Sequence, residues 1–359
     1  MQFTHRAVTH RLRSPFRVAH GVSATRTTVF ARLDTPDGPA WGEGALVPYY
    51  PYTLNDLTAY LDGIGETFGP KPGAPFDLDA ALAAIPDGPA PARCALDLAL
   101  HDAWGKAAEQ PLWSLWGLDP KTLPPSSFTL SIPDDLDAYR AELDAVAHLP
   151  VLKLKVGTGD ADRDLELVRL ARGRTGAALG VDANSAWTVD EAVRIVPELA
   201  ALGGILYVEQ PLAWRTPDGL RTSHEAWHRL RERLPDGLPP LLADEAVQGL
   251  DDVDGLAGAA DGVNVKLTKT GGLAGARRMI DRARAHGMQV LVGCMVETAV
   301  GVTAAAHLAP LADFADLDGA VLLDRPAVTG GMVWHNGRMT LPHHPGLGVF
   351  TWDSGVWPS

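Results

Sequence analysis

The chain is poor in cysteine, in long apolar runs and in secretory features. Its 359 residues include two cysteines, Cys94 and Cys294, which stand in separate segments and form no C-x-x-C pair. This excludes a disulfide framework, and we expect reduced thiols. No run of about 18 uncharged apolar residues is present, and the first residues lack the apolar core of a secretory signal. We therefore expect a cytoplasmic protein with no membrane partner.

Positive charge is also scarce. The chain has 31 Lys and Arg against 44 Asp and Glu, a formal net charge of −13, and no basic tract. Phosphate backbones are bound by clustered Lys and Arg, so no nucleic-acid partner is expected. The absence of a G-x-G-x-x-G motif after a first strand disfavours a dinucleotide fold. The absence of H-x-H and H-E-x-x-H motifs argues against a zinc hydrolase.

What the chain does contain is a change of pattern near residue 120. Residues 1–52 alternate in short β-like stretches with a D-G turn signal, which predicts an antiparallel meander. Residues 54–117 then show the three- and four-residue spacing of helices. Beyond them, Val/Ile/Leu runs followed by helical segments recur roughly every 20 to 35 residues, as in parallel β/α units.

We therefore predict an α/β fold: a (β/α)7–8 modified TIM barrel with an α+β N-terminal capping domain. The cap, made of the meander and the helices, is placed at residues 1–120. The barrel is placed at residues 121–330 and carries the metal and catalytic residues. Residues 331–359 are expected to return to the cap.

Acidic residues stand at the carboxyl ends of three predicted strands. They are Asp182 in L-G-V-D-A-N, Glu209 in L-Y-V-E-Q-P and Asp244 in L-L-A-D-E-A. In β/α barrels this end carries the active site, because the βα loops converge there. Carboxylate oxygens suit a hard cation such as Mg²⁺. The pattern therefore favours a Mg²⁺ site at the mouth of the barrel.

Lysines flank these acids on two further strands. Lys153 and Lys155 in L-K-L-K-V point to the same face, because side chains alternate along a strand. Lys266 in V-N-V-K-L-T lies about half a barrel away in strand order. Removing a proton next to a carboxylate creates a second negative charge, which a bound cation offsets. A lysine base must be neutral, and Lys153 is placed to lower the pKa of Lys155.

Together these segments resemble the muconate-lactonizing subgroup of the enolase superfamily. The motifs K-L-K, V-D-A-N, V-E-Q-P, A-D-E and V-N-V-K-L-T-K-T-G-G-L carry the barrel, while W-G-E and A-L-D-L-A-L-H-D-A-W-G-K resemble its capping domain. The likeness covers nearly the whole chain. It implies a Mg²⁺ site and an acid/base pair with supporting residues: Asp182, Glu209 and Asp244 for the metal, Lys155 and Lys266 for the protons, and Asn184 and Glu245 in support.

Within the subgroup the chain looks most like the dipeptide epimerases of the L-Ala-D/L-Glu type. The segments that carry this likeness are V-G-C-M-V-E-T-A-V-G and A-D-L-D-G. The likeness implies that the D-x-D acids bind the ammonium end of a dipeptide, and that other residues contact the substrate: Asp316 and Asp318, with Thr129, Lys153, Cys294 and Met295. Gly21 stands where Ala-Glu epimerases carry an arginine, so the likeness does not indicate which substrate side chains are preferred.

The expected function is a Mg²⁺-dependent dipeptide epimerase, with 1,1-proton transfer at the α-carbon of the C-terminal residue through an enediolate. The alternatives within the subgroup are a cycloisomerase, an o-succinylbenzoate synthase and an N-acylamino acid racemase, whose substrates bring no ammonium group to Asp318. A non-catalytic barrel should have lost a lysine or a carboxylate, and none is missing here. The expected partner is a small dipeptide, and a homo-oligomer is left open.

Overall fold

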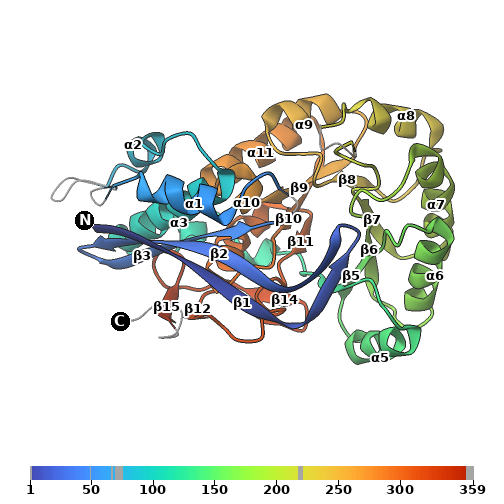
Figure 1. Ribbon diagram of the computed structural model, residues 1–359, viewed down its shortest axis with the longest axis horizontal. Helices are drawn as coiled ribbons and strands as arrows, with labels where there is room; N and C mark the ends of the chain where they lie inside the picture. Colours follow the sequence, from blue (N-terminus) through green and yellow to red (C-terminus); the bar gives the residue numbers. More distant parts are fainter. Residues whose placement is uncertain (1, 49, 66–67, 69–75, 217–220, 353–359) are drawn as a thin grey trace.

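The computed structural model describes residues 2–48, 50–65, 68, 76–216 and 221–352. An antiparallel sheet with its helices stands beside a parallel barrel, and the blue and red ends of the chain both lie on the side of the antiparallel sheet (Figure 1). Because the sheet and the barrel come from different parts of the sequence, the contacts between them are long-range ones.

The first part is a three-stranded sheet in the order β1-β2-β3, covered by helices. Its strands are β1 (Gln2–Val18), β2 (Gly21–Thr35) and β3 (Gly38–Leu46), and its helices are α1 (Leu54–Asp62), α2 (Leu78–Ala83), α3 (Ala90–Ala107) and α4 (Leu112–Leu115). Helix α3 packs directly on β3, where a Cβ atom added to Gly42 would lie 1.8 Å from the carbonyl oxygen of Ala95. The close approach of the two backbones therefore requires glycine there.

The second part is a sheet of eight parallel strands in the order of the chain. Its strands are β4 (Phe128–Leu130), β5 (Val151–Lys155), β6 (Ala178–Asp182), β7 (Ile205–Glu209), β8 (Leu241–Ala243), β9 (Gly262–Lys266), β10 (Gln289–Gly293) and β11 (Phe314–Asp316). The backbone N–H of Ser127, next to β4, donates to the carbonyl of Ala315 in β11 at 3.0 Å. The last strand thus meets the first, and the sheet closes into a barrel.

Helices surround the barrel and follow each strand except the last. They are α5 (Leu136–Val146), α6 (Ala161–Arg172), α7 (Val189–Leu202), α8 (Glu225–Arg233), α9 (Leu250–Leu256), α10 (Leu267–Thr270), α11 (Leu273–Ala285) and α12 (Ala299–Leu308), with 3₁₀ turns at Pro120–Thr122 and Ala309–Leu311. Their starts follow from the sequence: Thr188 and Glu191, for example, form a capping box at α7. Their apolar faces and the strands form one large buried core.

The last described segment lies against the first part of the chain. It contains β12 (Val328–Gly330), β13 (Val333–His335), β14 (Arg338–Thr340) and β15 (Val349–Trp352). The ring of Trp352 lies 4.3 Å from that of Trp41 and 4.8 Å from that of Phe30, measured between centroids. The predicted domain limits at residues 120 and 330 stay a prediction.

The β1–β2 hairpin, residues 11–26, extends beyond its sheet and over the mouth of the barrel (Figure 1). Leu12 forms a bridge with Leu323, and the carbonyl of Arg17 accepts from the N–H of Ile132 at 3.1 Å. At the tip, a Cβ atom on Gly157 would lie 2.9 Å from the Cβ of Ala19, and Gly157 has a φ of +92°. The hairpin therefore forms a roof that several barrel loops hold in place.

The fold prediction is confirmed, with eight parallel strands and the antiparallel meander ahead of them. Among the described residues, no helix combines the length and the apolar character needed to cross a bilayer.

Candidate active site

The three predicted metal-binding carboxylates stand side by side at the mouth of the barrel. Asp182 ends β6 and lies opposite Glu209, which ends β7. Asp244 follows the last residue of β8, the next strand in the sheet. All three side chains are buried. The structure thus brings together acids that are 62 positions apart in the sequence, from 182 to 244.

Burial and mutual repulsion make this group electrostatically costly. Burial raises the pKa of Glu209 to about 8, and the charges of Asp182 and Asp244 add to the shift. Burial also opposes ionisation of Asp182, but the ammonium groups of Lys155 and Lys153 outweigh it and hold its pKa at about 2. The pKa of Asp244 is lowered in the same way, by Lys266 and Lys269 against burial. The three acids therefore need cationic partners.

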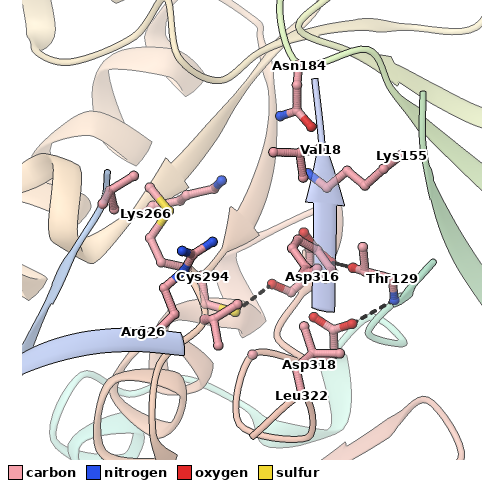
Figure 2. A pocket seen from close by; sticks show the side chains of 15 residues that line it. Val18, Arg26, Thr129, Lys155, Asn184, Lys266, Cys294, Asp316, Asp318 and Leu322 are labelled. Atoms are coloured by element: carbon pink, nitrogen blue, oxygen red, sulfur yellow. Dashed lines mark hydrogen bonds between the residues drawn. The ribbon is translucent and has the colours of Figure 1, made fainter. Parts of the chain in front are cut away.

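The two predicted catalytic lysines approach the acids from opposite sides. Lys155 ends β5 and donates to Oδ2 of Asp182 at 2.5 Å. Lys266 ends β9 and donates to Oδ2 of Asp244 at 2.7 Å. The two lysines face each other across the pocket (Figure 2). A substrate carbon held between them would meet one amine on each face.

Lys153, predicted to contact the substrate, is buried and absent from the described lining of the pocket. Its ammonium group is 2.7 Å from Glu209, 2.8 Å from Asp316 and 3.1 Å from Asp182. Burial tends to lower the pKa of this lysine, but the charges of Asp316, Glu209 and Asp182 raise it well above its usual value. Lys153 is therefore a fixed positive charge that joins Glu209 and Asp182 to the last strand.

Three residues of the site had not been singled out from the sequence. Lys269, one turn beyond Lys266, donates to Oδ1 of Asp244 at 2.6 Å. The side chain of Asn264 donates to Glu209 Oε1 at 2.8 Å, and Oε1 of Gln210 accepts from the backbone N–H of Asp244 at 2.8 Å. The K-L-T-K spacing places Lys269 one helical turn from Lys266 and could have identified it as a site residue. Asn264 and Gln210 have no such signal apart from their places in V-N-V-K and V-E-Q-P.

The donor set suits a hard cation. Among the described residues, no group of three or more His, Cys, Asp or Glu side chains stands ready-made around a metal position, because the acids face lysines. Several buried oxygens nevertheless accept no hydrogen bond: Oε2 of Glu209, which keeps its ion pair with Lys153, Oε2 of Glu245 and Oδ1 of Asn184. Carboxylate and amide oxygens are the ligands that Mg²⁺ prefers. The residues present therefore fit a magnesium ion.

The predicted supporting residues are joined to this group. The side chain of Asn184 donates to Glu245 Oε1 at 3.0 Å, and its backbone N–H donates to Asp182 Oδ1 at 2.9 Å. His20, at the tip of the β1–β2 hairpin, lies 3.5 Å from the same oxygen of Glu245. The roof is therefore linked to Asp182 through Glu245 and Asn184.

A second acidic pair forms one end of the pocket. Asp316 ends β11 and accepts from Ser127 Oγ at 2.5 Å, in addition to its bond with Lys153. Asp318 accepts from the backbone N–H of Thr129 at 2.7 Å. Burial raises the pKa of Asp318 to about 7, and the charge of Asp316 contributes to the shift. A cationic ligand group at Asp318 would remove this cost.

The pocket between these groups is lined from both parts of the chain (Figure 2). Its walls are Phe16, Val18, Arg26, Val47, Thr129, Lys155, Asn184, Lys266, Cys294, Met295, Val296, Asp316, Asp318, Gly319 and Leu322. Cys294 and Met295, which were predicted to contact the substrate, are among these residues. Burial raises the pKa of the Cys294 thiol well above its usual value. This thiol is therefore a poor nucleophile.

Glu43, in the W-G-E segment, connects the two parts outside the pocket. Its carboxylate accepts from the backbone N–H groups of Thr298 and Gly301, each at 2.9 Å, and from the Thr298 hydroxyl at 2.6 Å. These groups form the start of α12, where a negative charge is favourable. Glu43 thus docks the antiparallel sheet onto the barrel beside the site.

Comparison with known families gives the class of protein. Residues 138–353 match the family described as enolase C-terminal domain-like. Residues 1–117 match the N-terminal domain of mandelate racemase / muconate lactonizing enzyme. The chain belongs to the enolase superfamily, and the predicted family is confirmed.

Individual relatives share the full architecture. An L-Ala-D/L-amino acid epimerase from Maribacter sp. is 32% identical over 97% of this chain and 99% of its own. An L-Lys-D/L-Arg epimerase from Methylococcus capsulatus is 36% identical over 94% of this chain and 95% of its own. The structure of a dipeptide epimerase from Enterococcus faecalis, complexed with Mg and L-Leu-L-Tyr, has a TM-score of 0.84 at 28% identity and covers 97% of this chain and 98% of that one. The chain is thus an enzyme of the isomerase class.

Proposed function

We propose that the protein is a Mg²⁺-dependent dipeptide epimerase that inverts the α-carbon of the C-terminal residue of its substrate. The observation that carries this proposal is the position of Lys155 and Lys266 on opposite sides of one pocket, each ion-paired to a buried carboxylate. Inversion of a carbon requires one group that removes the proton and another that returns it to the opposite face. Two lysines on facing strands meet that requirement.

Buried acids at the two ends of the pocket would bind the two charged ends of the substrate. Asp182, Glu209 and Asp244 would hold the magnesium ion, which, when bound, supplies positive charge to the substrate carboxylate as the enediolate forms. At the other end Asp318, supported by Asp316, would bind the free ammonium group of the dipeptide. The two ends then hold the C-terminal α-carbon between the lysines. Thr129 fixes Asp318 through its backbone N–H.

A test of the function is loss of the C-terminal α-proton in D₂O. The purified enzyme, supplied with Mg²⁺, is incubated with pooled L,L-dipeptides, and the α-proton signals are followed by NMR. Exchange in a subset of dipeptides is the expected result. If no dipeptide exchanges while N-acylated amino acids or cycloisomerase substrates react, the proposal is wrong. Cytoplasmic location and a homo-oligomer stay predictions from the sequence.

The Asp318→Asn variant separates the epimerase from the other activities of the subgroup. The change removes the charge that would pair with the ammonium group, and such charged hydrogen bonds contribute about 1.5–3 kcal/mol. We expect kcat/KM for the best dipeptide to fall roughly 10- to 100-fold, measured by polarimetry or NMR. Asp324→Asn, at an exposed position outside the pocket, is the matched control. An unchanged kcat/KM for dipeptides in Asp318→Asn would contradict the assignment.

Arg26 gives an expectation for the C-terminal side chain of the substrate. It enters the pocket from β2 on the side of Lys266, and its guanidinium is steadied by a 2.8 Å bond to Ser23 Oγ (Figure 2). A cation among the apolar side chains of Phe16 and Val18 should favour acidic over basic C-terminal residues. Gly21 has no side chain that could carry a charge. Among the described residues that line the pocket, Arg26 is the cation that belongs to the hairpin.

The expected result is a preference for L-Xaa-L-Glu over L-Xaa-L-Lys that Arg26→Leu reduces by roughly 10-fold or more in kcat/KM. Arg17→Leu is the control, because Arg17 is absent from the described lining of the pocket and its guanidinium pairs with Asp134 at 2.7 Å. Competition between the two dipeptides in one NMR sample measures the ratio directly. A ratio that Arg17→Leu changes as much as Arg26→Leu would show that Arg26 does not select the side chain.

A further inference from the structure

A second cavity of about 240 Å³ adjoins the catalytic pocket on the side of Asp318. We call it the side cavity. It lies between β1, β4, α5 and the loop that follows β11, and it shares the side chains of Phe16, Thr129 and Leu322 with the catalytic pocket. Figure 2 shows Thr129, Asp318 and Leu322 on the same side of the catalytic pocket. The two spaces are therefore neighbours that share part of their walls.

The border is also where the substrate's ammonium group would be bound. The N–H of Thr129, which lines both spaces, donates to Asp318 Oδ2 at 2.7 Å, so the carboxylate is held beside this shared wall. In a dipeptide the ammonium nitrogen and the first side chain are attached to the same α-carbon. A dipeptide anchored at Asp318 thus begins its N-terminal side chain beside the wall that the two spaces share.

The walls of the side cavity suit an apolar side chain. Besides the shared Phe16 and Leu322, its lining includes Leu12, Phe128 and Val321. Two charged residues, Arg13 and Glu142, and the hydroxyls of Ser14 and Ser131 also border it. The Nε of Arg13 donates to the carbonyl of Leu323 at 2.9 Å. Burial raises the pKa of Glu142, which favours its neutral form. Filling such a space with hydrocarbon is favourable because it removes apolar surface from water.

We infer that the side cavity is the subsite for the N-terminal side chain of the substrate, and that the enzyme prefers dipeptides that begin with a large apolar residue such as Leu, Met or Phe. Gly or Ala at that position would leave the cavity to water. The inference rests on the proposed function, since it requires a dipeptide held by Asp318. It identifies the N-terminal residue of the substrate, which the proposed catalytic residues do not select.

The Ser131→Phe variant tests the subsite without touching the catalytic pocket. Ser131 lines the side cavity and is absent from the lining of the pocket. With one C-terminal residue kept constant, kcat and KM are measured for L-Leu-L-Xaa and L-Ala-L-Xaa. The wild-type enzyme should prefer the Leu dipeptide by at least about tenfold in kcat/KM. Ser131→Phe should lose that preference through a higher KM for the Leu dipeptide, with the Ala dipeptide changed less than about twofold.

Ser131→Ala is the matched control, because it removes the hydroxyl but leaves the cavity open, and it should keep the wild-type preference. Activity of Ser131→Phe on the Ala dipeptide shows that the variant is folded. If it fails to fold, Val321→Phe fills the same cavity from another element, the loop after β11. The inference is overturned if the wild-type enzyme takes Ala and Leu dipeptides equally well, or if the filling variants slow both dipeptides to the same degree. Lack of epimerisation with every dipeptide would overturn the proposed function instead.

Discussion

Lys266→Ala and Lys155→Ala should each abolish epimerisation, with losses of about 10²- to 10⁴-fold or more in kcat. Each lysine faces one side of the pocket from its own strand, and the two strands stand four places apart in the closed sheet of eight. Neither can therefore replace the other. The loss is measured as the rate at which an L,L-dipeptide is converted to its L,D epimer.

Isotope exchange makes this prediction specific. In D₂O each variant should still exchange the α-proton of one epimer, because the remaining lysine reaches one face of the carbon. Lys155→Ala and Lys266→Ala should retain exchange of opposite epimers. Lys121→Ala, at an exposed position far from the pocket lining, should behave as wild type. Exchange of both epimers by both variants would rule out the two-base arrangement.

Removal of divalent metal should stop the reaction completely, and added Mg²⁺ should restore it. The three metal-binding acids would then be left with lysine partners alone, and the charge that develops on the substrate would have no counter-ion. Asp244→Asn should weaken Mg²⁺ binding by at least about 100-fold, since even indirect contacts to a metal site contribute 10- to 100-fold. Titration calorimetry of Mg²⁺ into the metal-free protein gives this value independently of activity.

The control for this measurement is Asp251→Asn, an exposed acid near the start of α9. Its Mg²⁺ affinity should equal that of the wild type. Full activity in protein that metal analysis shows to be free of divalent ions would remove magnesium from the proposal.

The positions of the proposed catalytic lysines and of the proposed metal-binding acids could be predicted because they depend on local rules. A strand that ends in a polar residue brings that residue to the mouth of the barrel whenever the sheet is parallel. This reasoning placed Lys155, Asp182, Glu209 and Lys266 at the ends of their strands, where the structure has them. It required no knowledge of how the strands pack.

The contacts of Lys153 could not be read in the same way. The sequence suggested that it acts on its neighbour Lys155, whereas its ammonium group lies among Glu209, Asp316 and Asp182. The bond to Asp316 spans 163 positions and exists because β11 closes against β4. Closure of a barrel is a property of all its strands, and no single motif reveals it.

The role of Glu43 was hidden for a similar reason. Its partners at the start of α12 lie more than 250 positions away. A glutamate in a strand can face solvent, substrate or another domain, and its neighbours in W-G-E do not distinguish these cases. The long-range packing of the first sheet on the barrel decides between them.

The residues proposed to transfer protons and the residues that contact the substrate side chains come from separate stretches of sequence. The two lysines belong to barrel strands, whereas Phe16, Val18 and Arg26 come from the β1–β2 hairpin. Mutations in the hairpin can alter which side chains fit while the lysines keep their positions. Sequence changes in this one short N-terminal segment are thus a route to new substrate preferences that leaves the barrel residues unchanged.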